Sequence, residues 1–98
     1  MRFSPGEEVN IPCTIQPGAF PNERLITIKT DDAELTGFVN VERLIQSGLT
    51  HGFIVGRIVS QDKHSMMIQM PASFFTTASG RTSVNSGWAT HNLQAATG

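Results

Sequence analysis

The sequence predicts an all-β fold: a small five- to six-stranded barrel or roll with one short helical turn. Apolar and polar side chains alternate through several segments, which is the period of a half-buried strand. Prolines and glycines separate these segments as turn residues do. A chain of 98 residues with 39% hydrophobic content is large enough for one domain with a single core.

The first two predicted strands are joined by a proline-rich loop. Alternate residues from Val9 to Ile15 are apolar, so this segment reads as a strand with one buried face. Pro12 lies on the polar parity and cannot donate a ladder hydrogen bond, which indicates an edge strand or a bulge. The loop 17–22 contains two prolines and a glycine, and leads to a second strand over 23–30.

The next strand passes directly into a capped helical turn. Leu35 and Val39 share one parity, and the segment 35–39 is predicted to form a hairpin with the strand before it. Phe38 falls on the opposite parity, which is predicted to be the solvent side if this hairpin has one. Asn40 is suited to cap a short helix, and Gly48 is suited to end it. The residues that would share one face of this helix are Val41, Leu44 and Ile45.

Three further strands are predicted in the second part of the chain. The segment 53–59 is apolar on both parities, as expected of the most buried strand. The segment 65–70 is predicted to pair back with it, and 81–85 to form a last, weak strand. Between these two, Phe74 and Phe75 cannot both face the core, so one ring is expected to cap a barrel end or meet a partner.

The two parts of the chain resemble each other weakly. The segment 23–30 followed by 37–41 is similar to 64–71 followed by 80–84. A duplicated three-strand unit can close into a six-stranded barrel, so a duplication is one possible origin of the predicted fold.

The predicted barrel domain spans residues 1–85. The tail 86–98 is predicted to be an extension that is partly docked through Trp88 or flexible.

The strand order, the proline-rich first loop and the turn from Gly37 to Leu44 resemble an SH3-like small barrel, best over residues 5–45. Peptide-binding members of that group carry aromatic side chains in the first loop. This chain has no tyrosine, and its one tryptophan, Trp88, is near the C-terminus, so the resemblance does not imply binding of proline-rich peptides. An OB-like barrel is the alternative topology.

Charge and composition narrow the classes of function. Seven basic and eight acidic residues leave no cationic surplus for phosphate contacts, which disfavours general nucleic-acid binding. No apolar run reaches the length of a membrane span, and the N-terminus is too polar for a signal-peptide core, so we expect a cytoplasmic protein without membrane contact. The single cysteine, Cys13, fits a reducing compartment.

No motif for catalysis or metal binding is present. His51, His64 and His91 lack the spacing of metal ligands, and no serine lies in a nucleophile motif. We therefore expect no catalytic residue, no metal, no cofactor and no enzymatic activity. An enzyme or small-ligand site would need a pocket where His51 or His64, which flank one predicted hairpin, meets a carboxylate such as Asp62.

The remaining hypothesis is a non-enzymatic binding or regulatory module that acts through protein contacts, with a homodimer as one form of it. A nucleic-acid-binding small barrel is the first alternative, and a ligand-binding or enzymatic barrel with a histidine pocket is the second. Exposed aromatic and methionine side chains with arginines nearby are typical of protein-recognition surfaces, although the rings could instead close the barrel ends. The candidate contact residues are Phe20, Arg24, Phe38, Arg43, Met67 and Trp88.

Overall fold

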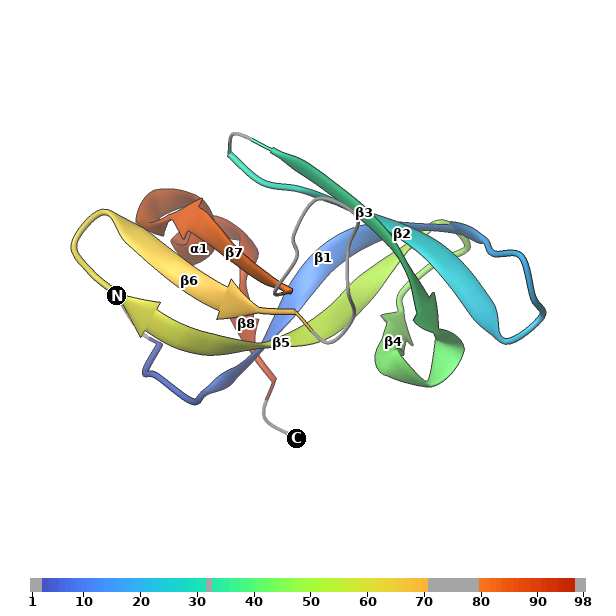
Figure 1. Ribbon diagram of the computed structural model, residues 1–98, viewed down its shortest axis with the longest axis horizontal. Coiled ribbons are helices and arrows are strands. Elements are labelled where there is room, and N and C mark those ends of the chain that lie inside the picture. Colours follow the sequence, from blue (N-terminus) through green and yellow to red (C-terminus); the bar gives the residue numbers. More distant parts are fainter. Residues whose placement is uncertain (1–2, 32, 71–79, 97–98) are drawn as a thin grey trace.

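The computed structural model describes residues 3–31, 33–70 and 80–96. In them, eight β-strands form one strongly curled antiparallel sheet, a half-barrel with one 3₁₀ turn and one α-helix (Figure 1). The strands are β1 (Glu8–Pro17), β2 (Glu23–Lys29), β3 (Glu34–Asn40), β4 (Leu44–Gln46), β5 (His51–Gln61), β6 (Ser65–Gln69), β7 (Arg81–Asn85) and β8 (Gln94–Ala95), and the helical elements are η1 (Val41–Arg43) and α1 (Ser86–Asn92).

The predicted all-β class is confirmed, but the sheet has more strands than predicted. The strand order is β3-β2-β1-β5-β6-β7, and the two short strands β4 and β8 add to it by pairing with β5 and β1. Short strands of two or three residues leave almost no periodic signal in a sequence, which is why they were missed. Phe74 and Phe75, of which one ring was predicted to cap a barrel end or meet a partner, lie outside the described part of the chain.

Two long strands, β1 and β5, cross the middle of the molecule and pair with each other (Figure 1). Each pairs on its other edge with two strands in turn: β1 with β8 and then β2, β5 with β4 and then β6. Pro12 lies between the stretch of β1 that pairs with β8 and the stretch that pairs with β2. The strand is therefore central rather than an edge, and the proline occupies a local gap in its pairing.

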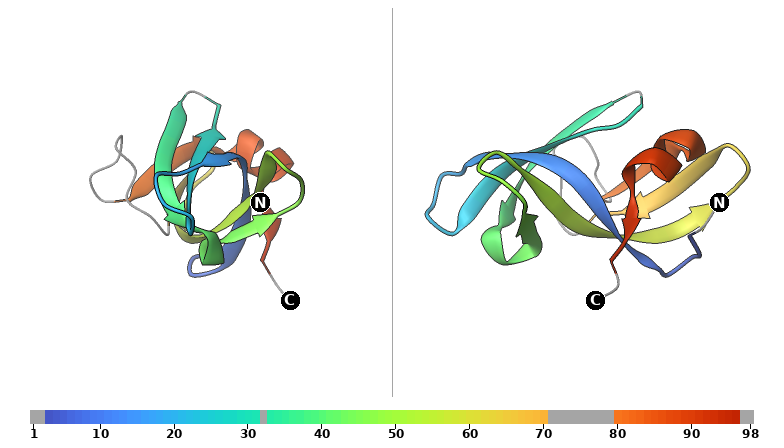
Figure 2. Two further views of the ribbon diagram at one scale, coloured as in Figure 1. Left: turned by 90° about the vertical axis from the view of Figure 1, so that its right-hand side faces the viewer. Right: turned by 180° about the vertical axis from the view of Figure 1, so that it is seen from behind.

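The core fills the inner side of the curled sheet, which is seen end-on in Figure 2. Its largest fully buried side chains come from β1, β2, β5 and β6, and they are Ile11, Ile26, Ile28, Ile54, Ile58, Met66, Ile68 and Val9. Gly52 and Gly56 also face inward on β5, where neighbouring chains approach too closely for a side chain. A Cβ on Gly52 would lie 2.4 Å from the carbonyl oxygen of Ile45, so glycine is required where the sheet bends.

The two halves of the chain repeat one arrangement. The first half runs β1-β2-β3-η1-β4 and the second runs β5-β6-β7-α1-β8. In each half three antiparallel strands are followed by a helical element and a short strand, which then pairs with the first strand of the other half. The repeated arrangement contains three strands per half, as the sequence suggested, and adds one helical element and one short strand to each half. That the repeat arose by duplication stays a prediction.

The ends of the helical elements match closely. Asn40 caps η1 with φ −71° and ψ 141°, and Asn85 caps α1 with φ −67° and ψ 139°; each side chain accepts from the backbone of the first helical turn. Leu44 and Leu93 end the two elements, also with similar backbone angles. Matching Asn40 to Asn85 makes Gly37 equivalent to Thr82, so the alignment of Gly37 with Gly80 drawn from the sequence was wrong.

The predicted cap at Asn40 is confirmed, whereas the predicted helix up to Gly48 is wrong. Only Val41–Arg43 is helical, and Leu44–Gln46 is the strand β4. The spacing of Leu44 and Ile45 suits both a helix face and a strand end. The two residues form a strand rather than a helix because the edge of β5 places backbone hydrogen-bonding partners opposite both of them.

The tail contains structure that the sequence did not predict. Ala89 of α1 and Leu93 belong to the core, Trp88 packs against it, and β8 extends the sheet beside β1. The assignment of 86–98 as a separate extension of a 1–85 domain stays a prediction. In the described part of the chain α1 is the one α-helix, and with seven residues it is too short to cross a membrane.

Candidate functional site

An exposed apolar row crosses the outer face of the first half. The strand registers place Phe38 of β3 beside Leu25 of β2, and Leu25 beside Gln16 of β1. Leu49, in the turn before β5, lines a hollow of about 220 Å³ together with Gln16 and Arg24. Phe38 is 40% exposed and Leu49 is 93% exposed. The predicted exposure of Phe38, which came from its parity, is confirmed.

A row of three threonine hydroxyl groups, next to His51, runs beside the apolar row. His51, Thr14, Thr27 and Thr36 are successive cross-strand neighbours on β5, β1, β2 and β3. The hydroxyls of Thr27 and Thr36 lie 3.4 Å apart, and Thr14 donates to the carbonyl of Thr27. We call these two rows together the first-half face. Its residues are Gln16, Leu25, Phe38, Leu49, His51, Thr14, Thr27 and Thr36, and none carries a full charge when His51 is neutral.

The equivalent surface of the second half has different chemistry. The two cap residues fix the match, because Asn40 pairs with Glu23 and Asn85 pairs with Ser65. Two residues further along each strand pair, Phe38 and Leu25 of the first half are then equivalent to Ser83 and Met67 of the second. The same match makes the neighbours Thr27 and Thr36 equivalent to Gln69 and Arg81. An aromatic ring is therefore replaced by a serine, and a hydroxyl pair by a polar and a charged side chain.

The charged row of the second half is held by its own contacts. Arg57 of β5 contacts Glu8 of β1 at 3.3 Å, and Arg81 donates to the side-chain oxygen of Gln69 at 2.9 Å. Both side chains of the Arg57–Glu8 pair are more than half exposed, so the pair adds little to stability. The equivalent rows have thus diverged: the first-half face has no charged member, whereas the equivalent row of the second half contains Arg57 and Arg81. The charged groups nearest to the first-half face are the Lys29–Glu34 pair in the next row of the β2–β3 hairpin and Arg24, which lines the hollow beside Leu49.

A groove of about 450 Å³ lies where β4 and the end of β6 flank β5. Its charged lining residues are Glu42 and Arg43 of η1, together with Glu8 and Arg57. Two carboxylates balance two guanidinium groups, so the groove has no strong preference for an anion or a cation. Its apolar floor is formed by Leu44, Ile45, Val55 and Met70.

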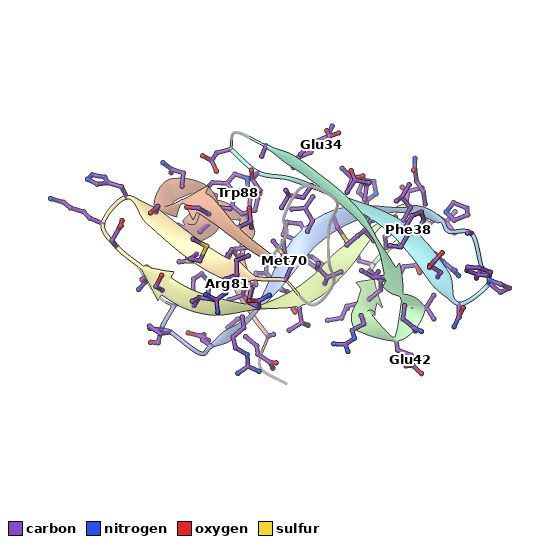
Figure 3. All side chains as sticks on the ribbon, in the orientation of Figure 1. Glu34, Phe38, Glu42, Met70, Arg81 and Trp88 are labelled. Atoms are coloured by element: carbon purple, nitrogen blue, oxygen red, sulfur yellow. The ribbon has the colours of Figure 1, made fainter. Side chains whose placement is uncertain are left out.

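The structure separates the six predicted contact residues. Phe20 is 65% exposed in the β1–β2 turn. Arg24 donates to the carbonyls of Pro21 and Glu23, which ties its guanidinium to that turn. These two belong to the same half as Phe38, whereas Trp88 lies at the opposite end of the molecule (Figure 3).

The other two candidates lie elsewhere. Arg43 lines the groove described above, and Met67 is half-buried on the second half. A contact role for all six residues stays a prediction. Sequence reasoning missed Leu49 and the 47% exposed Ile45. For Leu49 a signal existed, since it is the one large apolar residue of the polar connector between Gln46 and Gly52.

The histidines do not form a common site. His51 begins β5, whereas His64 lies in the turn that follows the end of this 11-residue strand. At about 3.3 Å per residue the strand alone separates the two histidines by roughly 30 Å, so they cannot contribute to one pocket. His91 lies on α1, where its ring nitrogen Nδ1 is 2.9 Å from the carbonyl of Gly87. No group of potential metal ligands occurs within residues 3–31, 33–70 and 80–96.

Asp62 closes the β5–β6 turn instead of serving a histidine pocket. Its carboxylate accepts from the backbone N–H groups of His64 at 2.8 Å and Ser65 at 2.9 Å. The hydrogen bond from His64, followed by that from Ser65, lowers the pKa of Asp62 below its usual value of 3.8. The contact is an Asx turn at an exposed hairpin tip.

The Asp62 contact predicts a pH-dependent contribution to stability. Because the pKa is lower in the folded chain, the contribution is complete above the unfolded pKa and is lost as the pH falls through the folded one. We expect Asp62→Ala to lower the urea midpoint at pH 7 and to have a smaller effect at pH 2. Asp62→Asn, which keeps an acceptor oxygen, serves as the control and should have the smaller effect at pH 7. Equal losses for Asp62→Ala at both pH values would contradict this role.

Cys13 does not provide a reactive group. The residue is buried on the inner face of β1, and desolvation raises the pKa of its thiol to about 11. The neutral thiol therefore predominates at physiological pH, and thiolate chemistry is suppressed.

The comparisons with known proteins give no relative. No family model, no curated protein and no solved structure matches the chain.

Proposed function

We propose that this protein is a non-enzymatic binding or regulatory module that contacts a partner protein through the first-half face. The observation that carries the proposal is the contrast between two equivalent surfaces. One presents Phe38 and Leu25 beside a threonine pair, and the other presents Ser83 and Met67 beside Arg81 and Gln69. Because both halves have the same backbone arrangement, the fold does not account for the apolar row.

The composition of the first-half face suits a protein partner. The cores of protein interfaces are depleted in charged residues and enriched in aromatic ones. Single exposed apolar side chains are common on monomers, but here three are aligned across neighbouring strands and the loop beside them. The adjacent hydroxyl row supplies hydrogen-bonding groups that need not lose a full charge on burial.

Two features of the chain fit this proposal. The segment 5–45, whose pattern resembles an SH3-like barrel, includes the β2–β3 hairpin, and Leu25 and Phe38 lie on the outer side of that hairpin. A cytoplasmic location fits the free thiol of Cys13.

The experiment is an affinity capture from lysate of the source, with and without nuclease, at low and moderate salt. The baits are the wild type, Phe38→Ser and Met67→Ser. Phe38→Ser places in the first half the residue that the second half has at Ser83, and Met67→Ser is the matched control. We expect a defined protein with the wild type and Met67→Ser, and a recovery about tenfold lower with Phe38→Ser, as the loss of an aromatic anchor worth about 1.4 kcal/mol predicts.

Three results would contradict the proposal. The first is equal recovery with all three baits. The second is loss of the captured material on nuclease treatment or at moderate salt, which would instead favour the nucleic-acid alternative. The third is a Phe38→Ser variant whose urea unfolding curve shows that the ring stabilises the fold rather than a complex.

A further inference from the structure

The seam between the two halves is a continuous β-ladder. β1 and β5 pair through seven residue pairs, from Glu8 opposite Arg57 to Thr14 opposite His51. Neither half completes its own sheet, because β4 of the first half pairs with β5 and β8 of the second half pairs with β1. The sheet of each half is therefore completed by a strand of the other half: β8 pairs with β1, and β4 pairs with β5.

The seam is symmetric about its middle. β4 places Ile45 opposite Phe53, and β8 places Gln94 opposite Asn10, so Asn10 and Phe53 are equivalent positions of the two halves. The residues that follow them, Ile11 and Ile54, are then also equivalent, and they face each other in the ladder. Both are fully buried. The pairing around them has the two-fold geometry of a symmetric strand dimer.

The only covalent link between the halves is the turn 47–50. Its residues are exposed, and it is held by local contacts: the N–H groups of Ser47 and Gly48 donate to the carbonyl of His51, and Gln46 donates to the carbonyl of Gly48. The turn meets the seam at one further point, because the N–H of Ile15 in β1 donates to the carbonyl of Thr50 at 2.8 Å. The ladder would be the same if the two halves came from different molecules.

We propose that a second copy of this chain is a partner, and that the two copies associate by exchanging halves. The first half of one molecule then docks on the second half of the other, with the turn 47–50 opened as the hinge. This inference uses the seam and does not depend on the first-half face or on the proposed function.

The equilibrium between the monomer and the exchanged dimer depends on the protein concentration. The two forms share the seam contacts, so the monomer is favoured mainly by the effective concentration of its own second half, on the order of millimolar for a short link. The ratio of exchanged dimer to monomer should rise in proportion to the protein concentration at refolding. Exchange in the folded state requires the buried seam to open, so the distribution set at refolding should persist.

The test uses full-length chains joined across the seam. Asn10 and Val55 face each other, and the bonds from Ile15 to Thr50 and from Ile58 to Glu7 show that they form a non-hydrogen-bonded pair. Cα atoms in such pairs are about 4.5 Å apart, within the range of a disulfide. A tagged Asn10→Cys chain and an untagged Val55→Cys chain, both in a Cys13→Ala background, are unfolded, mixed, refolded together and oxidised.

We expect disulfide-linked pairs of one tagged and one untagged chain when refolding takes place near 1 mM, and about tenfold fewer relative to monomer near 0.1 mM. The chain with both substitutions is the positive control and should close within itself. Asn10→Cys mixed with Ser83→Cys is the control for random oxidation and should not link.

Two outcomes would overturn the proposal. One is a closed positive control with no more linkage between the Asn10→Cys and Val55→Cys chains than in the random-oxidation control. The other is dimer seen by sedimentation without linkage across the seam, which would place self-association on another surface such as the first-half face. If the first outcome is found and the monomer still captures a protein through Phe38, the proposed function stands without the exchange.

Discussion

Replacing Ile54 by alanine is expected to lower the free energy of unfolding by about 2–5 kcal/mol. Ile54 is fully buried at the centre of the seam, opposite Ile11 on one side and Leu44 on the other. Truncation removes three buried carbon atoms and leaves a cavity that the surrounding strands, fixed by their ladders, cannot close. Urea unfolding followed by circular dichroism measures the loss.

Ile45→Ala is the matched control for this prediction. Ile45 lies on the neighbouring strand β4 and is 47% exposed, so its truncation creates no enclosed cavity. We expect a clearly smaller loss, below about 1 kcal/mol. Similar losses for Ile54→Ala and Ile45→Ala would show that the seam is not the centre of the core.

The second large effect is expected from Gly56→Ala. A Cβ at this position would lie 2.6 Å from Cδ1 of Ile11, 3.0 Å from Cγ2 of Ile68 and 3.1 Å from the carbonyl oxygen of Gln69. Overpacking of this kind typically costs about 1–3 kcal/mol, because side chains must leave their preferred rotamers or strands must separate. The loss is again read from urea unfolding.

A double-mutant cycle isolates the clash with Ile11. Ile11→Val removes the Cδ1 atom, so the loss for Gly56→Ala together with Ile11→Val should be smaller than the sum of the two single losses. Gly48→Ala is the control, since no atom lies within 4 Å of the position of its Cβ. Additive losses in the cycle would contradict the close approach of β5 and β1 at this point.

Much of the fold was readable because its signals are local. Runs of apolar residues separated by turn residues predicted β1, β2, β3, β5 and β6, and the segment after Gly80 predicted β7 as a weak strand. Asn40 was correctly predicted as a cap. What failed depended on distant partners. Leu44 and Ile45 form a strand because β5 lies beside them, and Asn85 caps a helix whose first turn contains Gly87, a residue of low helix propensity.

The candidate surface was predictable only in part. The exposure of Phe38 was predicted correctly from its parity, because the residues of the opposite parity in β3 are buried. The alignment of Phe38 with Leu25 and Gln16 depends on the register of three strands, which periodicity does not determine. The separation of His51 from His64 depends likewise on the length of β5, which extends well beyond the part that pairs with β6.

Hydroxyl-radical footprinting of the free protein and of its captured complex tests the central claim most directly. The reaction modifies exposed leucine, phenylalanine and methionine side chains, so both halves are read in one sample without substitutions. If the first-half face is the contact surface, modification of Phe38, Leu25 and Leu49 falls in the complex while that of Met67 is unchanged. Protection of Met67 with the first-half face still fully modified would contradict the account.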